Sequence, residues 1–94
     1  MKIVGLIWLE DILTKLRDKH GVEQDEVRQV LESQPWFRFV EKGHRRGEKV
    51  YTALGQTQAG RYLIVFFVYK KDKRALVISA RDMIQAERKA YEKR

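Results

Sequence analysis

Two arginines lie beside predicted β-strands, where their guanidinium groups are well placed to bind a phosphate. Arg61 precedes the apolar segment 62–69, and Arg81 follows the apolar segment 75–79. If these strands are antiparallel, the start of one and the end of the other lie at the same end of the sheet, and the two arginines approach each other. Two guanidinium groups there would bind a phosphate in bidentate fashion. The alternative is that one or both pair with a carboxylate, and Glu87 is the obvious partner.

A second set of candidate groups lies on the last predicted helix. Ile84, Glu87, Arg88 and Tyr91 share one helical face because their spacings are three, four and seven residues. This face mixes apolar and charged side chains. Either Glu87 or Tyr91 transfers a proton beside Arg81, or Ile84 and Tyr91 pack on the sheet while Glu87 and Arg88 form an ion pair.

A third set is basic and fills the turn-rich segment between the first two predicted strands, with Lys42, His44, Arg45 and Arg46. Residues 1–35 hold five Lys/Arg against seven Asp/Glu, a net charge of −2. Residues 36–94 hold fifteen against six, a net charge of +9, which gives the chain its net charge of +7. Neutralisation of phosphates by Lys and Arg releases counterions and drives association. The sequence therefore predicts binding of a polyanion, RNA above all, with a solubilising surface as the alternative.

Several other classes of site find no support in the sequence. The chain has no cysteine, so it offers no disulfide, thiolate metal site or cysteine nucleophile, and a cytoplasmic location is expected. His20 and His44 are far apart in the sequence, with no carboxylate at metal-ligand spacing, so we expect no metal and no cofactor. Because no apolar run reaches about 18 residues, we expect no membrane span, and the N-terminus lacks the pattern of a secretion signal.

These groups must be positioned by one small α+β domain. The chain has 94 residues, 44% of them hydrophobic, which suffices for one modest core, so we expect a single domain over residues 1–94. The predicted order is two N-terminal helices, a four-stranded, mainly antiparallel sheet and a C-terminal helix. Apolar periodicity places helices over 9–20, 25–34 and about 82–91, and strands over 36–41, 49–54, 62–69 and 75–79, with 62–69 in the centre.

Short motifs occur along the chain in a specific order: Trp8, Lys19-His20-Gly21-Val22, Gly55-Gln56-Thr57, Gly60-Arg61-Tyr62-Leu63, Ser79-Ala80-Arg81, and Glu87-Arg88 with Tyr91. In this order and spacing, the segment 8–91 resembles the BrnT toxins of bacterial type II toxin–antitoxin systems. The resemblance implies a RelE-like fold and a ribonuclease that halts growth by cutting RNA. It also implies neutralisation by a ribbon-helix-helix antitoxin, BrnA.

The resemblance also suggests roles for individual residues. Metal-independent RNA cleavage needs a base for the 2′-hydroxyl, cations around the pentavalent phosphate and an acid for the leaving oxygen. Arg61 and Arg81 are the expected phosphate ligands, and the proton-transfer candidates are His20, Glu87 and Tyr91, in decreasing order of preference. His20 is alternatively a cap of the first helix. The residues expected to bind RNA are Lys42, His44, Arg45, Arg46, Lys49 and Arg88.

The chain departs from this family at several polar positions. Leu9, Ile12 and Leu16 stand where members often carry an acid, a lysine and an asparagine, and Leu76 stands where a basic residue is common. The basic residue expected early in the second strand is at best Lys49. Two other functions stay open: a non-catalytic RNA-binding module, and a basic surface that docks an acidic protein partner.

Overall fold

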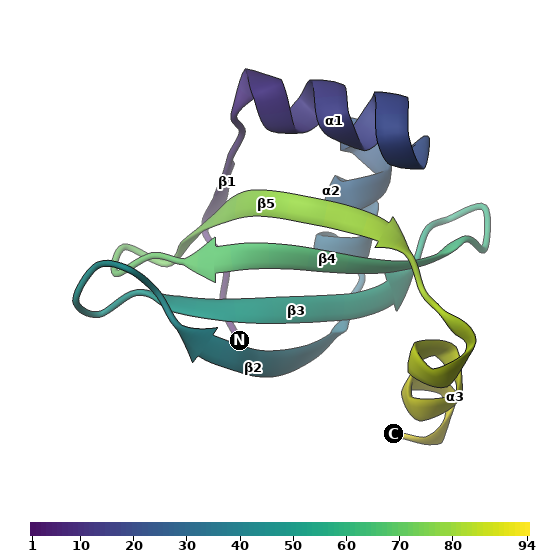
Figure 1. The fold of residues 1–94 in the computed structure, drawn as a ribbon. Helices are drawn as coiled ribbons and strands as arrows, with labels where there is room; N and C mark the ends of the chain where they lie inside the picture. Colours follow the sequence, from purple (N-terminus) through teal and green to yellow (C-terminus); the bar gives the residue numbers. More distant parts are fainter.

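A computed structural model describes residues 1–94 as an α+β fold with three helices and a five-stranded sheet (Figure 1). The helices are α1 (Glu10–His20), α2 (Gln24–Glu32) and α3 (Gln85–Lys93). The strands are β1 (Gly5–Ile7), β2 (Trp36–Lys42), β3 (Lys49–Gln56), β4 (Tyr62–Tyr69) and β5 (Arg74–Asp82). The predicted α+β class is confirmed.

The predicted number of strands was wrong by one. The chain begins with β1 rather than with a helix, and β1 pairs in parallel with β5, Gly5 opposite Arg74 and Ile7 opposite Leu76. A three-residue strand is too short to show an alternating pattern, and its partner lies almost 70 residues away in the sequence. The other four strands form the expected antiparallel meander, and the order β1-β5-β4-β3-β2 confirms β4 in the centre.

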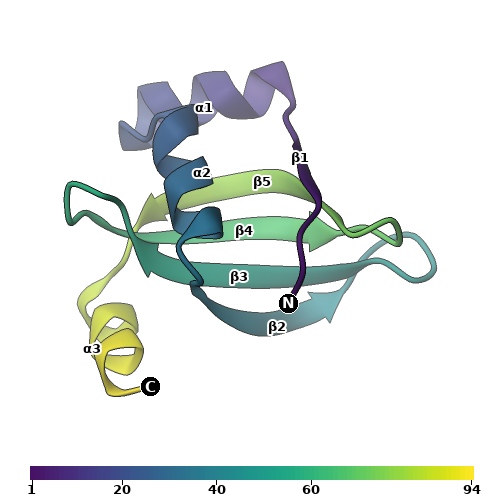
Figure 2. The ribbon, with the colours of Figure 1, turned by 180° about the vertical axis from the view of Figure 1, so that it is seen from behind.

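One face of the sheet carries α1, α2 and the larger part of the core. Figures 1 and 2 show both helices on the same side, and the N-terminal segment crosses the strands on this side too, behind them in Figure 1 and in front of them in Figure 2. The first helix ends where Gly21 adopts φ 59° and its N–H bonds to the Arg17 carbonyl, as expected for a glycine after a helix. The buried core on this face contains Leu16, Val22, Val27, Val30, Leu31, Ala53, Leu63, Val65, Phe67, Ala75, Val77 and Ala80.

The opposite face has a smaller apolar cluster. Leu54, Ile64 and Tyr91 are buried there, and Trp36, Tyr62, Phe66 and Met83 pack against them. Strand alternation explains the division, because Ala53 and Leu54 are consecutive and point to opposite faces. Of the three helices, only α3 contributes to this cluster, and it lies beyond one end of the sheet in Figures 1 and 2.

The two hairpin turns lie together at the other end of the sheet. The β2–β3 turn follows Lys42 and the β4–β5 turn follows Tyr69, and Lys49 and Tyr69 are directly paired. We call this region, residues 41–49 and 70–74, the hairpin end. None of the helices is both long and apolar enough to cross a membrane.

Candidate functional site

The face of the sheet opposite α1 and α2 combines arginines with aromatic rings, and we call it the arginine–aromatic face. All four cation–π contacts of the molecule lie on it, because each ring belongs to or packs on the smaller apolar cluster. The pairs, with the distance from the guanidinium carbon to the ring centre, are Arg38 and Trp36 at 4.8 Å, Arg81 and Phe66 at 5.5 Å, Arg88 and Tyr62 at 3.8 Å, and Arg94 and Tyr91 at 3.9 Å.

Arg81 lies at the end of β5 and is the most constrained cation of this face. Its Nη1 and Nη2 donate to the two carboxylate oxygens of Glu87, at 2.7 and 2.9 Å, and Nη1 also donates to the carbonyl of Asp82 at 3.2 Å. Nε and the second hydrogen of Nη2 make no hydrogen bond within the chain. The guanidinium group is thus held in place by one ion pair while it keeps donors for another acceptor.

Glu87 joins Arg81 to the start of α3. Its Oε1 accepts the backbone N–H of Ile84 at 2.9 Å, which satisfies one free amide at the helix N-terminus. The hydrogen bond from Arg81 holds the pKa of Glu87 below its ordinary value, and the Ile84 amide adds to this effect. Glu87 is therefore ionised at neutral pH. The helix predicted over about 82–91 begins later, because β5 continues to Asp82, and Glu87 caps the start of α3.

The helical stripe predicted on α3 resolves into separate contacts. Tyr91 is 9% exposed and its ring meets Tyr62 edge to face at 6.0 Å, whereas Ile84 is 58% exposed and does not pack on the sheet. Arg88 pairs with Glu92 rather than with Glu87. The Tyr91 hydroxyl makes no hydrogen bond within the chain, and no buried side-chain polar atom lacks a partner, so solvent reaches this hydroxyl.

Arg61 is bonded on the other face of the sheet. Its Nε and Nη2 bind the carboxylate of Asp82 at 2.7 and 3.1 Å, and Nη1 binds Glu26 at 3.1 Å. The remaining hydrogens of Nη1 and Nη2 go to the carbonyls of Gly21 at 2.7 Å and His20 at 3.0 Å. Every N–H of the guanidinium group thus has an acceptor within the chain. Arg61 can contact a phosphate only by giving up one of these bonds.

Arg61 and Arg81 lie at the same end of the sheet, as expected, but on opposite faces. Arg81 is paired across the strands with Ile64, and Arg61 lies three residues before Ile64, so their side chains point to opposite sides. The two arginines share only Asp82, whose side chain binds Arg61 and whose carbonyl binds Arg81. The expected partner Glu87 pairs with Arg81 alone.

The three proton-transfer candidates also lie on different faces of the sheet. Glu87 and Tyr91 belong to α3 and lie on the arginine–aromatic face with Arg81. His20 ends α1 on the other face, where its carbonyl binds Arg61 and its imidazole is exposed. Its side chain does not cap α1, because backbone bonds from Gly21 and Val22 close the helix end. The structure therefore groups His20 with Arg61, and Glu87 and Tyr91 with Arg81.

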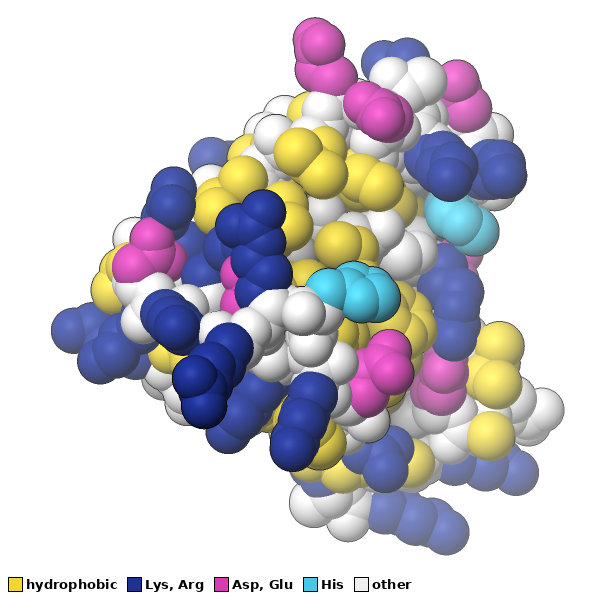
Figure 3. Space-filling model, turned by 60° about the vertical axis from the view of Figure 1, so that its left-hand side comes forward, with side chains coloured by type: hydrophobic (Ala, Val, Ile, Leu, Met, Phe, Trp, Pro, Cys, Tyr) yellow, Lys and Arg dark blue, Asp and Glu magenta, His cyan; other side chains and the backbone are white.

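The residues expected to bind RNA fall at opposite ends of the strands. Arg88 lies on α3, whereas the others belong to the hairpin end: Lys42, His44, Arg45, Arg46 and Lys49. Strand β3 has eight residues, which at about 3.4 Å per residue separates the two ends by about 25 Å. Figure 3 brings the hairpin end forward and shows Lys and Arg side chains gathered over it.

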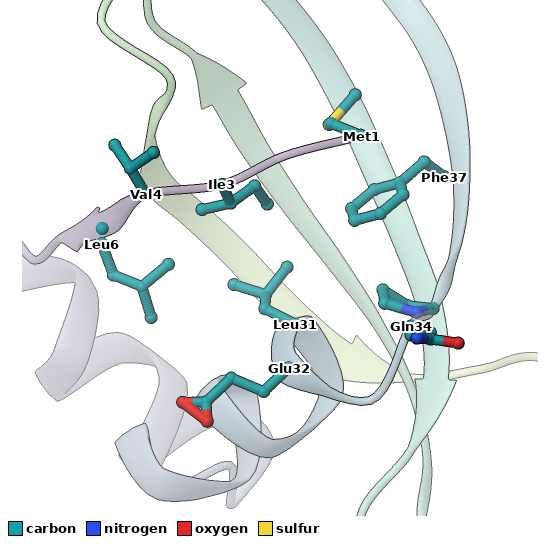
Figure 4. Close-up of a pocket in the computed structure, with 10 residues that line it drawn as sticks. Met1, Ile3, Val4, Leu6, Leu31, Glu32, Gln34 and Phe37 are labelled. Atoms are coloured by element: carbon teal, nitrogen blue, oxygen red, sulfur yellow. The ribbon is translucent and has the colours of Figure 1, made fainter.

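A separate hollow of about 390 Å³ lies between the N-terminal segment, α2 and β2. Figure 4 shows that it is lined mainly by apolar side chains, among them Ile3, Leu6, Leu31 and Phe37, with Glu32 at its border. It contains no pair of acid and base groups. No group of three or more His, Asp and Glu side chains is placed to hold a metal ion.

Sequence reasoning missed two cations of the arginine–aromatic face, Arg38 and Arg94. The alternation of β2 already places Arg38 on the same side as Trp36, so an arginine two residues from a tryptophan on an edge strand was an available signal. Arg94 follows α3, and its contacts with Tyr91 depend on how the helix docks. No pattern in the sequence indicates that docking.

The arrangement can bind a nucleic-acid strand and stabilise negative charge. Half-buried aromatic rings offer surfaces for stacking of unpaired bases, and arginines beside them bind phosphates. Arg81 adds a fixed guanidinium group next to an ionised carboxylate and a solvent-accessible phenol. These are the kinds of group that a reaction at phosphorus needs.

Comparison with known proteins connects this chain to a family. A family model described as the ribonuclease toxin BrnT of type II toxin–antitoxin systems matches residues 8–87. Among solved structures, the crystal structure of the Brucella abortus ribonuclease toxin BrnT is similar, with a TM-score of 0.61 and 19% identity over 89% of this chain and 100% of that chain. This likeness concerns the fold. No curated protein matches the chain.

Proposed function

This chain belongs to the BrnT family of ribonuclease toxins of type II toxin–antitoxin systems, and we propose that it is an endoribonuclease toxin that cuts RNA on the arginine–aromatic face and thereby inhibits growth. The observation that carries the proposal is Arg81, which is fixed by Glu87 and still has free donors among stacked aromatic rings. A cation held in this way stabilises charge on a phosphate without reorganising during the reaction.

In this proposal, the side chains of the chain perform metal-independent cleavage. Arg81 binds the non-bridging oxygens of the scissile phosphate through Nε and Nη2. Glu87, ionised because Arg81 lowers its pKa, accepts the proton of the 2′-hydroxyl that attacks phosphorus. Tyr91, whose hydroxyl is not fully buried and makes no hydrogen bond within the chain, donates a proton to the leaving 5′-oxygen. The products are a 2′,3′-cyclic phosphate and a 5′-hydroxyl, and protons and charge balance once the proton on Glu87 passes through water to the Tyr91 phenolate.

Arg61 and His20 take a supporting part in the proposed mechanism. Because Arg61 has all its N–H groups bound within the chain, we propose that it positions the α1–α2 turn and the end of β5. Through Asp82 it fixes the strand end that carries Arg81. His20 lies in this cluster, on the far face from Arg81, and contributes its carbonyl to the same network.

The setting of the reaction follows from family membership. We propose one domain over residues 1–94, because the five strands form one sheet and the family model spans residues 8–87. We further propose a RelE-like fold, a cytoplasmic location and neutralisation by a ribbon-helix-helix antitoxin of the BrnA kind. A short reading frame for such a protein beside the gene would support the pairing.

The proposal is tested by induced expression and by cleavage of RNA with purified protein. We expect expression to stop growth and the protein to cut RNA in the presence of a chelator, with Arg81→Ala abolishing both effects. A matched control is Arg28→Ala, since Arg28 is exposed and pairs only with carboxylates on its own helix. If Arg81→Ala cuts RNA at the wild-type rate, the mechanism assigned here is wrong.

A non-catalytic RNA-binding module is the second candidate. It is favoured by one observation, that both carboxylate oxygens of Glu87 already accept bonds from Arg81. This reading predicts RNA affinity that falls steeply with salt while RNA stays intact after long incubation. A dock for an acidic protein would instead bind a small acidic partner and no RNA.

A further inference from the structure

We propose that the hairpin end is a second phosphate-binding site, which holds RNA about 25 Å from Arg81, and that the substrate is single-stranded RNA long enough to reach both sites. This inference rests on the proposed function and deepens it, because it defines the class of substrate. It also includes the β4–β5 turn, which the sequence indicates only as a charged connection.

The first observation is that the two turns pack together as one surface. A hollow at this end is lined from both turns by Arg45, Arg46, Glu48, Lys70, Lys71 and Asp72. Gly47 has φ 82°, and a Cβ there would lie 2.3 Å from Cε of Lys71. The glycine thus permits the lysine of one turn to lie across the backbone of the other. Lys70 and Glu48 join the turns by an ion pair of 2.5 Å.

The second observation is that most Lys and Arg side chains of the hairpin end form no ion pair with a carboxylate of the chain. The hairpin end holds eight Lys/Arg against three acidic residues. Two of its cations form ion pairs, Lys70 with Glu48 and Arg74 with Asp72. The other six make no ion pair: Lys42, Arg45, Arg46, Lys49, Lys71 and Lys73.

Within this set, Lys42 and Lys49 lie directly opposite each other across β2 and β3. Like charges in such a pair destabilise a hairpin. By strand alternation both side chains point to the face that carries Tyr51, so RNA reaches them only where it bends around the end of the sheet, and a phosphate bound there would remove the repulsion.

The third observation is the path between the two sites. Arg38 lies on β2 between Trp36 near α3 and Lys42 at the hairpin end, and it is exposed on the arginine–aromatic face. An RNA strand that starts at Arg81 on β5 and crosses β4 and β3 near Arg88 would reach Arg38 on β2 and then the turns. Bases stack on aromatic rings only when they are unpaired, so the aromatic part of this path selects single-stranded RNA.

The test measures binding of two RNAs, of about 3 and about 24 nucleotides, because only the longer one can span about 25 Å. Every 2′-hydroxyl is methylated so that the RNA is bound but not cut. The test variant is Arg46→Gln with Lys71→Gln. The matched control is Lys15→Gln with Lys19→Gln, because both lysines lie on α1, on the other face, and form no ion pair.

We expect the test variant to raise the Kd for the long RNA about tenfold and to reduce the slope of log affinity against log salt by about 1.4, since two cations are lost. The short RNA should bind the test variant and the wild type equally. The control variant should bind the long RNA at least threefold more tightly than the test variant does. Equal losses for the two variants, or equal losses for the two RNAs, would overturn the inference.

A second variant, Lys42→Gln with Lys49→Gln, guards against unfolding. Because it removes a repulsive pair, it should unfold at the same or a higher urea concentration than the wild type. It should also bind the long RNA more weakly than the wild type does. Full affinity for long RNA in this variant counts against the site. A wild-type protein that binds neither RNA overturns the proposed function itself, whereas wild-type binding without any effect of the hairpin variants overturns only this inference.

Discussion

Each face of the sheet has an arginine that forms an ion pair with a glutamate at the start of a helix, but the two arginines differ in their other contacts. On each face an arginine binds the glutamate at the third position of a helix, Arg61 with Glu26 of α2 and Arg81 with Glu87 of α3. Each glutamate also accepts the N–H of the residue that precedes its helix, from Glu23 at 3.0 Å and from Ile84 at 2.9 Å. The arginines differ in the number of remaining partners.

In the proposed mechanism, that number separates a structural role for Arg61 from a functional role for Arg81. Arg61 adds Asp82 and two carbonyls, so it is saturated and ties α1, α2 and β5 together. Arg81 adds one carbonyl and keeps free donors, and the surface around it is aromatic and basic. Residue type and position at a strand end are therefore insufficient to assign a phosphate ligand. The count of unsatisfied donors is the better criterion.

The strongest way to break this comparison is to replace Arg81. We expect Arg81→Ala to lower the rate of RNA cleavage about 100-fold, as loss of a preorganised donor does in other enzymes, while the free energy of unfolding falls by no more than about 1 kcal/mol. Cleavage at saturating RNA and urea unfolding measure the two effects. Arg81→Lys should restore little activity, because an ammonium group cannot hold Glu87 in bidentate fashion and keep planar donors free.

The opposite pattern is expected for Arg61. Arg61→Ala leaves Glu26 and Asp82 without their cation, so the free energy of unfolding should fall by about 2 kcal/mol. Cleavage per folded molecule should stay within about threefold of the wild type, below the loss from a transition-state donor. Urea titration and cleavage at low temperature separate these quantities. A 100-fold loss of activity at unchanged stability would show that Arg61 acts on phosphate after all.

Part of this contrast was accessible from the sequence. The central strand β4 was predicted with correct bounds because its residues are apolar on both faces, and α1 was predicted to end beside Gly21. The Arg61 and Arg81 motifs were recognised, and both lie at the expected end of the sheet. Their faces were not predictable, because a shift of one residue in strand register reverses every side chain. The register of β4 with β5 shifts between Phe66 and Phe67, where Ile78 of β5 has no partner, and no local pattern predicts this bulge.

The departures from the family pattern also divide between the faces. Leu16 is 2% exposed and Ile12 packs on the same core, so two lost polar positions have become interior packing on the Arg61 side. Leu76 pairs with Val68 and lies between Ala75 and Val77, both of the larger core, so it points to the arginine–aromatic face. Only this departure removes a cation from the proposed RNA path. Sequence comparison alone cannot make the distinction, because burial is a property of the packed fold.

Acid titration sharpens the comparison on the Arg61 side. The hydrogen bond from Arg61 holds the pKa of Asp82 below its ordinary value of 3.8. A carboxylate with a lowered pKa in the folded state stabilises the fold above its unfolded pKa, and this contribution is lost as pH falls through the folded value. Asp82→Asn should therefore remove about 0.5 kcal/mol near neutral pH, an amount discounted for the exposure of the side chain, and nothing below about pH 2. Urea unfolding from about pH 2 to 6 measures this difference.

In an Arg61→Ala background, the further change Asp82→Asn should have a much smaller pH-dependent effect, since the partner that lowers the pKa most is gone. Equal pH dependence of the Asp82→Asn effect in both backgrounds would mean that another group perturbs this carboxylate. Apart from Arg61, the charge that lowers the pKa of Asp82 is His20, and its effect is smaller than that of Arg61.

The smallest expected effect tests whether the open face can be improved. Leu76→Arg adds a cation on the side of the sheet that carries Arg81, and its aliphatic part can replace the half-buried leucine while the guanidinium group reaches water. We expect RNA affinity to rise about twofold and the salt slope to steepen by about 0.7, the value for one added phosphate contact. Leu76→Gln is the control, because it loses the same apolar contacts without adding charge. A gain shared by both variants would point to altered packing rather than to a phosphate contact, and the arginine–aromatic face would then not extend along β5 beyond Arg81.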